Sequence, residues 1–449
     1  MKFKGGIGRD QDVLIPSRIE DYIGEEHLAK LVVTICDSLD ISRIEKKYSR
    51  NGQHAYDPRM MTSLLFYGYS IGTRSSRKIA ESCHERLDFM YITRNLMPTH
   101  DRISDFRKDN LEELKELFTQ IVMIGSMIGI IEMGNIRVSI DGTKMRANAS
   151  AKLTKDEAKL KGHKEQVEKE INDLFNEAQK TDAEEDMKRK IMKKMGSKNS
   201  RKDAIKDALE TLQKQKEEAR NKIAREKDRE PTKAETKKIE KMKINITDQD
   251  AKYMKERSGV IKPNYNGQIS VDEKNQFILA NDLVTDCNDQ HQLIPIVQKT
   301  CDNLGRHPDM VKGDNGYYPQ LQEAVKTFTE TEFYIDDKKR RKQNIDMEET
   351  RKKYDDIQYS NLEKLLTPEG NMEYRKRMHT AEPPFGWMKF NSGYRYFLLR
   401  GKEKAGGEFN LMCIGYNFKK ILYYLRKKDT VKIDAGNGKI MGRGTILPA

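Results

Sequence analysis

Two aspartates follow short apolar segments at positions where a metal site could form. Residues 136–140 alternate aliphatic and polar side chains, which is the period of a β-strand, and Asp141 comes directly after them. Residues 310–313 predict a second strand, and Asp314 follows it. Open α/β sheets build their sites at the carboxyl ends of their strands. If these strands are neighbours in one sheet, the two carboxylates lie close together.

Converging carboxylates suit one kind of chemistry. Carboxylates around one point repel one another, and a divalent cation between them removes that repulsion. Oxygen-only ligation favours Mg²⁺, with Mn²⁺ as a substitute, and two such ions suit in-line displacement at phosphorus. The plainer interpretation is that each aspartate caps a helix or a turn. Further acids could supply the second carboxylate; these are Asp272, Asp282, Asp286 and Asp289.

A third carboxylate, Glu382, lies in a strongly basic segment. The spacing is Tyr374-x2-Arg377-x4-Glu382-x6-Lys389. This arrangement suits a metal ligand flanked by two cations that hold phosphate groups. An ordinary helix ion pair between Glu382 and Arg377 or Lys376 explains the same residues.

Helices are expected before the first strand, over residues 1–135. Asp57 followed by Pro58 predicts a helix start, and a further helix fits residues 99–118. Short helices joined by tight turns are typical of a DNA-binding domain, in which residues 99–108 would be the groove-reading helix. A helical bundle without DNA contacts explains the pattern equally.

A charged insert follows the first strand, over residues 151–245. In residues 151–240, 47 of 90 side chains are charged, so the segment cannot join a compact core. Apolar residues at steps of three and four predict an antiparallel helical hairpin with a narrow seam. The seam comprises Val167, Ile171, Leu174, Ala178, Ile205, Leu209 and Leu212. The segment 196–200 is expected to separate the two helices, and a partly disordered spacer is the alternative.

Residues 246–428 return to a mixed α/β pattern. A hairpin is expected over 268–280, and the strands and helices after it predict a sheet covered by helices. The expected organisation is a helical domain at 1–135, an α/β domain at 136–150 and 246–428, the hairpin insert at 151–245 and a loose tail at 429–449.

The charge distribution favours a polyanionic partner. The formal net charge is +13, but residues 1–140 carry 20 basic and 20 acidic groups, whereas residues 388–449 carry 13 and 4. No segment approaches the roughly 20 apolar residues of a membrane helix. Five scattered cysteines without a CxxC pair suit a reducing cytoplasm.

The motifs taken in order resemble those of the DDE transposases of bacterial insertion sequences. They are Asp141-Gly-Thr-Lys, Gly313-Asp314-Asn-Gly-Tyr and the Tyr374 to Lys389 segment, followed by Phe397-Leu-Leu-Arg-Gly and Asn410-Leu-Met-Cys-Ile-Gly-Tyr-Asn. The helical region before them is similar to the N-terminal domain of these enzymes.

The resemblance implies an RNase H-like catalytic core that binds two Mg²⁺ ions through Asp141, Asp314 and Glu382. It implies cleavage and transfer of double-stranded DNA at the terminal inverted repeats of an insertion sequence, with target DNA as second partner. DNA-binding residues would be Tyr374, Arg377, Lys389, Arg102 and Arg107. A homodimer on DNA, without membrane contact and associated with the cytoplasmic nucleoid, is expected.

Departures from the family pattern bear on that assignment. Four residues separate Arg377 from Glu382, where three are more usual, and Asn315 follows Asp314 where Ala or Lys is more usual. The insert follows the first strand, whereas better-known relatives have theirs after the fifth. Two other functions remain open, a metal-dependent nuclease without strand transfer and a non-catalytic DNA-binding scaffold.

Overall fold

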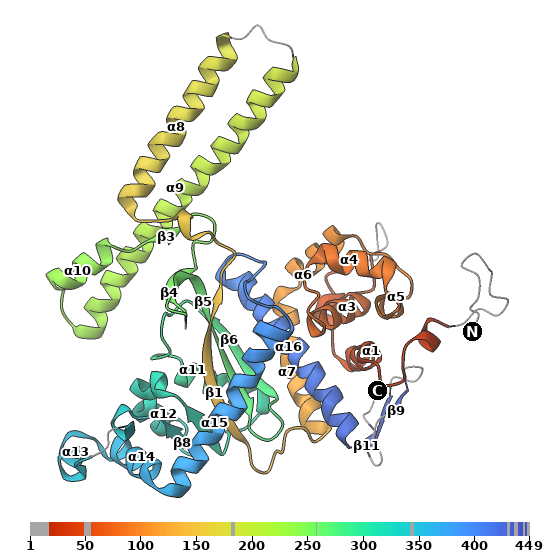
Figure 1. The fold of residues 1–449 in the computed structure, drawn as a ribbon, viewed down its shortest axis with the longest axis vertical. Helices are drawn as coiled ribbons and strands as arrows, with labels where there is room; N and C mark the ends of the chain where they lie inside the picture. Colours follow the sequence, from red (N-terminus) through yellow and green to blue (C-terminus); the bar gives the residue numbers. More distant parts are fainter. Residues whose placement is uncertain are drawn as a thin grey trace, which may run out of the picture. The chain divides into compact units, whose positions relative to one another are not determined.

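The computed structural model describes most of the chain. The described residues are 18–48, 55–180, 185–256, 258–341, 345–428, 432–434, 439–442 and 445–446. They divide into two compact units, one of residues 1–133 with 411–449 and the other of residues 134–410 (Figure 1). No helix of the described residues is long and apolar enough to cross a membrane.

The first unit is largely helical. Its elements are η1 (Ile19–Tyr22), α1 (Leu28–Ser38), α2 (Ser42–Glu45), α3 (Pro58–Ser70), α4 (Ser76–Glu85), α5 (Leu87–Thr93), α6 (His100–Asp109) and α7 (Leu111–Met127), with residues 411–427 of α16 (Lys402–Lys427). The predicted start of α3 is confirmed, since the Asp57 carboxylate accepts a hydrogen bond from the amide of Arg59 and Pro58 is the first helical residue.

The single helix expected over 99–118 is wrong. Thr99 caps α6, but the helix ends at Asp109, and Asn110 leaves the helical conformation with φ −118° and ψ 27°. The Asn110 side chain donates a hydrogen bond to the carbonyl of Phe106 and so occupies a terminal acceptor of α6. The apolar spacing continues across this break, which is why periodicity did not reveal it.

The second unit contains a mixed sheet, as predicted at the level of an α/β class. The strands are β1 (Arg137–Arg146), β4 (Lys252–Lys255), β5 (Ile261–Asp272), β6 (Ile278–Val284), β7 (Met310–Gly313) and β8 (Glu332–Ile335). Their order is β4-β5-β1-β7-β8, and β6 also pairs with β5. The strands β1, β7 and β8 are parallel to one another, whereas β5 is antiparallel to β1 and to β6.

Helices pack on this sheet from several parts of the chain. They are α11 (Leu293–Leu304), α12 (Leu321–Thr327), α14 (Asp356–Leu366) and α15 (Pro368–Gly386). The same region contains η3 (Asn315–Gln320), η4 (Lys338–Arg341), α13 (Met347–Lys353) and a π-helical turn over Trp387–Asn391. Helix α11 packs on β5 and β6, and α15 packs on β1 and β5. The α15 contact matters most for function, because β1 carries Asp141.

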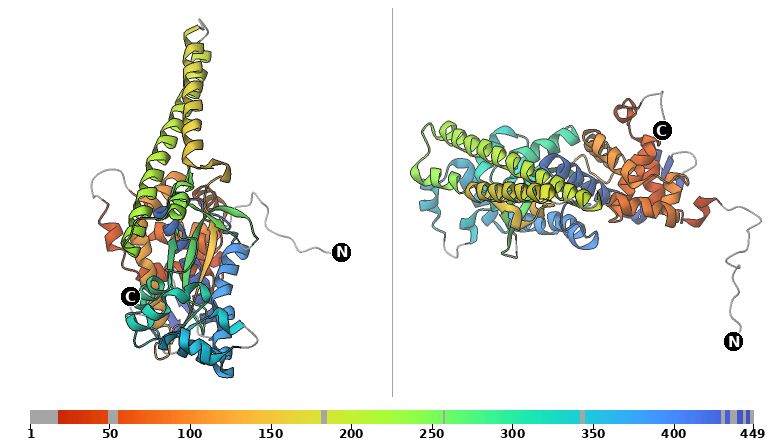
Figure 2. Two further views of the ribbon diagram at one scale, coloured as in Figure 1. Left: turned by 90° about the vertical axis from the view of Figure 1, so that its left-hand side faces the viewer. Right: turned by 90° about the horizontal axis from the view of Figure 1, so that it is seen from above.

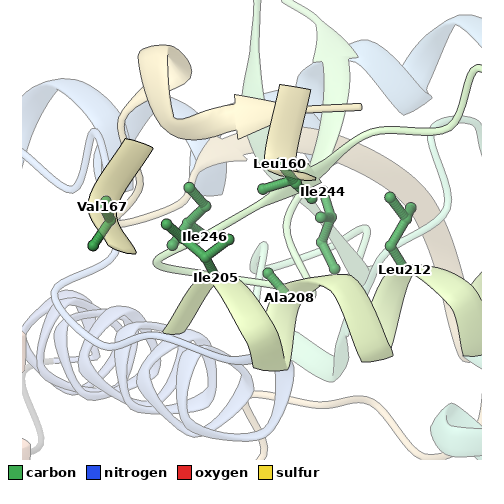
Figure 3. Close-up of a cluster of buried hydrophobic side chains, with 7 residues drawn as sticks. All are labelled: Leu160, Val167, Ile205, Ala208, Leu212, Ile244 and Ile246. Carbon is green, nitrogen blue, oxygen red and sulfur yellow. The ribbon is translucent and has the colours of Figure 1, made fainter. Parts of the chain in front are cut away.

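The charged insert forms the expected helical hairpin. Helices α8 (Glu157–Lys180) and α9 (Glu185–Lys227) lie side by side in every view (Figure 1 and Figure 2). Of the predicted seam, Val167, Ile205 and Leu212 are buried, Ile171, Leu174 and Leu209 are partly buried, and the side chain of Ala178 lies outside the described part of the chain. The buried cluster (Figure 3) comprises Leu160, Val167, Ile205, Ala208, Leu212, Ile244 and Ile246. Short elements complete the insert, namely η2 (Ala151–Leu153), β2 (Thr154–Lys155), α10 (Lys233–Glu240) and β3 (Ile244–Asn245).

The break expected at residues 196–200 is wrong. Helix α9 runs through Gly196, and the hydroxyl of Ser200 donates a hydrogen bond to the carbonyl of Gly196 within the helix. One glycine costs a helix only about 1 kcal/mol relative to alanine, which the strong helix formers on either side offset. The two helices are instead joined after Lys180, outside the described residues.

The tail expected to be loose has regular structure where it is described. Strands β9 (Lys432–Asp434), β10 (Lys439–Gly442) and β11 (Thr445–Ile446) form a small antiparallel sheet. The other residues of the tail lie outside the described part of the chain.

Candidate active site

Strand pairing brings two of the predicted acids together. In the parallel pair of β1 and β7, Ser139 lies opposite Lys312. The same offset places Asp141 opposite Asp314, which directly follows the last residue of β7. Neighbouring strands lie about 4.8 Å apart, and two positions of the same parity point to the same face. Asp141 therefore presents its carboxylate beside that of Asp314. The prediction that Asp141 ends its strand is wrong, because β1 continues through pairing with β5 to Arg146.

A guanidinium group from α15 lies against both acids. The Nη1 atom of Arg377 is 3.6 Å from Oδ1 of Asp141, and its charge also acts on Asp314. The side chain of Arg377 is only 13% exposed, and its Nε and Nη1 atoms form no hydrogen bond with the described residues. Such a poorly paired buried cation is unusual, because buried charges normally saturate their hydrogen bonds.

The pKa values in this cluster record the competition between burial and charge. Burial raises the pKa of Asp314, against the opposing effect of Arg377 and of a hydrogen bond from the Gly316 amide. Burial would lower the pKa of Arg377, but Tyr374, Asp141 and Asp314 raise it. The site therefore favours an added positive charge near the two aspartates.

A third acid, Asp289, lies beside these residues. Its Oδ1 accepts hydrogen bonds from Nδ2 of Asn266 at 2.7 Å and from Nε2 of Gln268 at 2.6 Å. A Cβ atom on Gly142 would lie 2.6 Å from that oxygen, and one on Gly316 would lie 3.3 Å from Cβ of Asp289. The glycines after Asp141 and near Asp314 thus leave room for this side chain.

Sequence reasoning treated Asp289 only as one of several alternative acids. The signal that could have identified it is a pair of buried amides on β5, Asn266 and Gln268, in a strand that is otherwise buried. Buried amides require partners, and Asp289 is the partner of both.

Tyr317 is a fully buried residue beside the three aspartates. Its ring is fully buried, and its hydroxyl donates a hydrogen bond to Oε1 of Gln268. Burial, followed by the charges of Asp289, Asp141 and Asp314, raises the pKa of Tyr317 well above its usual value. The phenol is therefore neutral under all working conditions and serves as a fixed hydrogen-bond donor.

Lys389 reaches the same edge of the sheet from the turn after α15. Its Nζ donates hydrogen bonds to the hydroxyl of Thr143 at 2.5 Å and to the carbonyl of Lys144 at 2.9 Å. Thr143 is two residues beyond Asp141 on β1 and so lies on the same face. Of the predicted phosphate-binding residues, Arg377 therefore lies next to Asp141, and Lys389 contacts β1 two and three residues further on.

Glu382 does not join the other two acids. It is exposed on α15, and the described residues include no group of three or more His, Cys, Asp or Glu side chains that could hold a metal ion. Five helical residues turn through about 500°, which places Glu382 about 140° around α15 from Arg377. With the usual spacing the acid would occupy position 381, about 40° from Arg377, where the chain has buried Ala381. The extra residue in the motif explains the difference.

Two of the residues predicted to contact DNA, Tyr374 and Arg107, are buried. Tyr374 packs in a cluster with Met310, Tyr334 and Leu365, and the Arg340 guanidinium lies 4.5 Å from its ring centre. The guanidinium of Arg107 is buried in the first unit, where its hydrogen bonds include Tyr69, Ser76 and the Arg74 carbonyl. Both side chains support the fold, whereas Arg102 is exposed on α6.

Comparisons with known proteins agree with the motifs. A family model described as a transposase domain, DUF772, matches residues 17–109, and one described as a transposase DDE domain matches residues 333–422. The second match includes Arg377, Glu382 and Lys389, whereas Asp141 and Asp314 precede it. No curated protein and no solved structure matches the chain. The chain therefore carries a transposase domain and a transposase DDE domain, which support a DDE transposase of insertion-sequence type, an enzyme that acts on DNA.

Proposed function

We propose that the second unit is an RNase H-like core that cuts and joins DNA at the terminal inverted repeats of an insertion sequence. The strand order β6-β5-β1-β7-β8 supports this proposal, because it combines an antiparallel hairpin with two parallel strands around a central β1. The observation that carries it is the pairing that sets Asp141 opposite Asp314 beside Arg377.

Asp141 and Asp314 would hold the divalent cation that DDE transposases generally use. The chemistry of the two donors fits, since both are carboxylates whose mutual repulsion a divalent cation would remove, and the buried Arg377 beside them has nitrogen atoms that form no hydrogen bond with the described residues. We propose Mg²⁺, with Mn²⁺ as a substitute. When bound, the metal would activate the attacking oxygen and stabilise the leaving oxygen at phosphorus.

The full set of ligands is a narrower proposal. The pair of ions implied by the family pattern needs a third carboxylate, and Glu382 is assigned to it from the motif. Asp289 is the alternative, supported by its place beside Gly142 and Gly316. Loss of metal-dependent cleavage in Glu382→Gln, but not in Asp289→Asn, supports the motif. The reverse result assigns the third ligand to Asp289.

The chain's own groups would position the DNA. Arg377 and Lys389 flank the acids and suit the negatively charged phosphate that undergoes reaction. The neutral Tyr317 and the amides of Asn266 and Gln268 hold Asp289 and the floor of the site in one arrangement. Little proton transfer by side chains is required, because positioning and charge neutralisation dominate phosphoryl transfer.

The remaining parts would serve recognition and assembly. The helical residues 1–135 would recognise the terminal repeats, with Arg102 on α6 available for a phosphate or base contact. Residues 136–150 and 246–428 would form the catalytic domain, interrupted by the insert at 151–245. We also propose a homodimer on DNA, because two ends of an element must be joined, and association with the nucleoid in the cytoplasm.

The direct test uses purified protein and an oligonucleotide that carries the repeat flanking the gene. Wild-type protein with Mg²⁺, then with Mn²⁺, should release a 3′-hydroxyl and join it to target DNA, and chelator should stop both steps. Cut ends without joined product would indicate a nuclease. Cutting by Asp141→Ala at the wild-type rate would remove this site from the reaction altogether.

A further inference from the structure

Two adjoining hollows lie beyond the end of β1 that is nearest the insert. The first, of about 530 Å³, is lined by Arg146, Lys262 and Arg400, together with the half-exposed ring of Tyr396. The second, of about 410 Å³, is lined by Lys152, Lys155, Lys159, His163 and Arg201 at the side of the helical hairpin. Leu153 lines both, so the two hollows adjoin.

Among the residues that the structure describes, no acidic side chain lines either hollow. Acids that do not line the hollows neutralise some of the cations, because Arg146 binds Glu256 and Lys159 lies 3.6 Å from Asp156. In the described part of the chain, Lys152, Lys155 and Arg201 form no ion pair within 4.0 Å, although the charge of Arg201 acts on Glu170. The guanidinium of Arg201 contacts His163. The hairpin side of the surface is therefore strongly cationic.

The histidine in this group is held as a neutral ring. Burial, followed by the charges of Arg201 and Lys155, lowers the pKa of His163. Its Nε2 lies 3.0 Å from Nη2 of Arg201, so the neutral ring accepts a hydrogen bond from the guanidinium. This contact orients the guanidinium of Arg201 within the second hollow. An external anion would neutralise the positive charge of that hollow.

We propose that the two hollows form one groove that binds the sugar-phosphate backbone of duplex DNA on its way to the active site. That the groove leads to the active site rests on the proposed function, which places the reaction at Asp141. Strand β1 continues from Asp141 to Arg146, and Arg146 lines the first hollow. Five strand residues span about 17 Å, which is close to five base pairs of duplex. A repeating anion matches a row of cations better than a single small ligand does.

The test compares two variants that lose the same charge. One replaces Lys152, Lys155 and Arg201 by glutamine, and the other replaces Lys190, Lys193 and Lys194, which are exposed on α9 nearer the tip of the hairpin. Binding to a duplex of about three helical turns is measured at several salt concentrations in chelator. Circular dichroism confirms that both variants are folded.

The groove variant should lose at least about tenfold in affinity, and its slope of log affinity against log salt should fall by about 2 to 3. The tip variant should change the slope by less than about 1. Equal losses in both variants, or an unchanged slope in the groove variant, would overturn the proposal. So would binding of an acidic peptide in preference to duplex.

The result is independent of catalysis. Binding is measured without metal ions, and Asp314→Asn should bind the duplex as wild type does. If the protein binds duplex as expected but does not cleave it, the proposed function is wrong and the groove proposal stands. If cleavage is normal but the groove variant binds duplex like the tip variant, only the groove proposal is wrong.

Discussion

Two charged clusters lie on the same strand and the same helix, yet they are built in opposite ways. In one, the fully buried Nζ of Lys312 on β7 binds Glu273 and Glu373, each at 2.5 Å. In the other, Asp314 directly follows β7 and lies beside Asp141, whose Oδ1 is 3.6 Å from Nη1 of Arg377, an ionic rather than a hydrogen-bonding distance. The charge of Arg377 also acts on Asp314. Glu373 and Arg377 are one turn apart on α15.

The difference separates a structural use of charge from a functional one. Although burial raises it, hydrogen bonds from Lys312 and Lys376 lower the pKa of Glu373 to about 2. At Asp314 burial prevails and raises the pKa. In the first cluster, protein side chains neutralise the buried charges, and the ion pairs fix α15 on the sheet. In the second, a bound cation can add to the positive charge that Arg377 supplies.

The largest effect on activity should come from the cluster of Asp141, Asp314 and Arg377. Asp314→Asn removes one of two adjacent carboxylates, so metal-dependent cleavage should fall at least about 1,000-fold, or about 4 kcal/mol in barrier. Folding should be unchanged or slightly strengthened, because a buried like charge is removed. Cleavage assays and thermal unfolding check both. A variant that is inactive because it is unfolded would contradict the comparison.

The cluster around Lys312 should show the reverse pattern. Lys312→Met leaves Glu273 and Glu373 without their shared buried partner and should cost about 3–5 kcal/mol of unfolding free energy. Lys376→Met is the matched control, because Lys376 binds the same Glu373 from a side chain that is 47% exposed. It should cost less than about 1 kcal/mol. Urea unfolding measures both, and equal losses would refute the distinction.

The sequence predicted the parts of the site that depend on local pattern. Alternation located Asp141 on a strand and a short apolar run located Asp314 at a strand end, and parallel pairing then required them to meet, although β1 continues beyond Asp141. Glu382 lies on another face of α15 because the motif has four residues between Arg377 and Glu382 instead of three, and the sequence pattern gave no means of weighing that difference. Asp289 lies in a loop without periodicity, and only the folded contacts with Asn266 and Gln268 single it out.

Stability against acid should also separate the clusters. The folded pKa of Glu373 lies below its unfolded value near 4.5, so its contribution is present above pH 4.5 and is lost as the pH falls towards 2. Allowing for solvent near its partly exposed side, the loss should be about 1–2 kcal/mol. Glu373→Gln should flatten this acid limb in unfolding measured from pH 5 to pH 2.5. An unchanged limb would show that other carboxylates control it.

The smallest effect should come from Asp289, which borders the cluster of Asp141 and Asp314 but is itself well bonded. Asp289→Asn keeps the size of the side chain but removes the charge that two amides and Lys144, 4.0 Å away, now face. Because both hydrogen bonds end on Oδ1, the amide oxygen can still accept them, but more weakly than a carboxylate does, so the active site should loosen without unfolding. Cleavage should fall about five- to tenfold, or about 1 kcal/mol in barrier, with less than about 1 kcal/mol lost in stability. Loss of activity as complete as in Asp314→Asn would instead make Asp289 a metal ligand and extend the demand for positive charge to three acids.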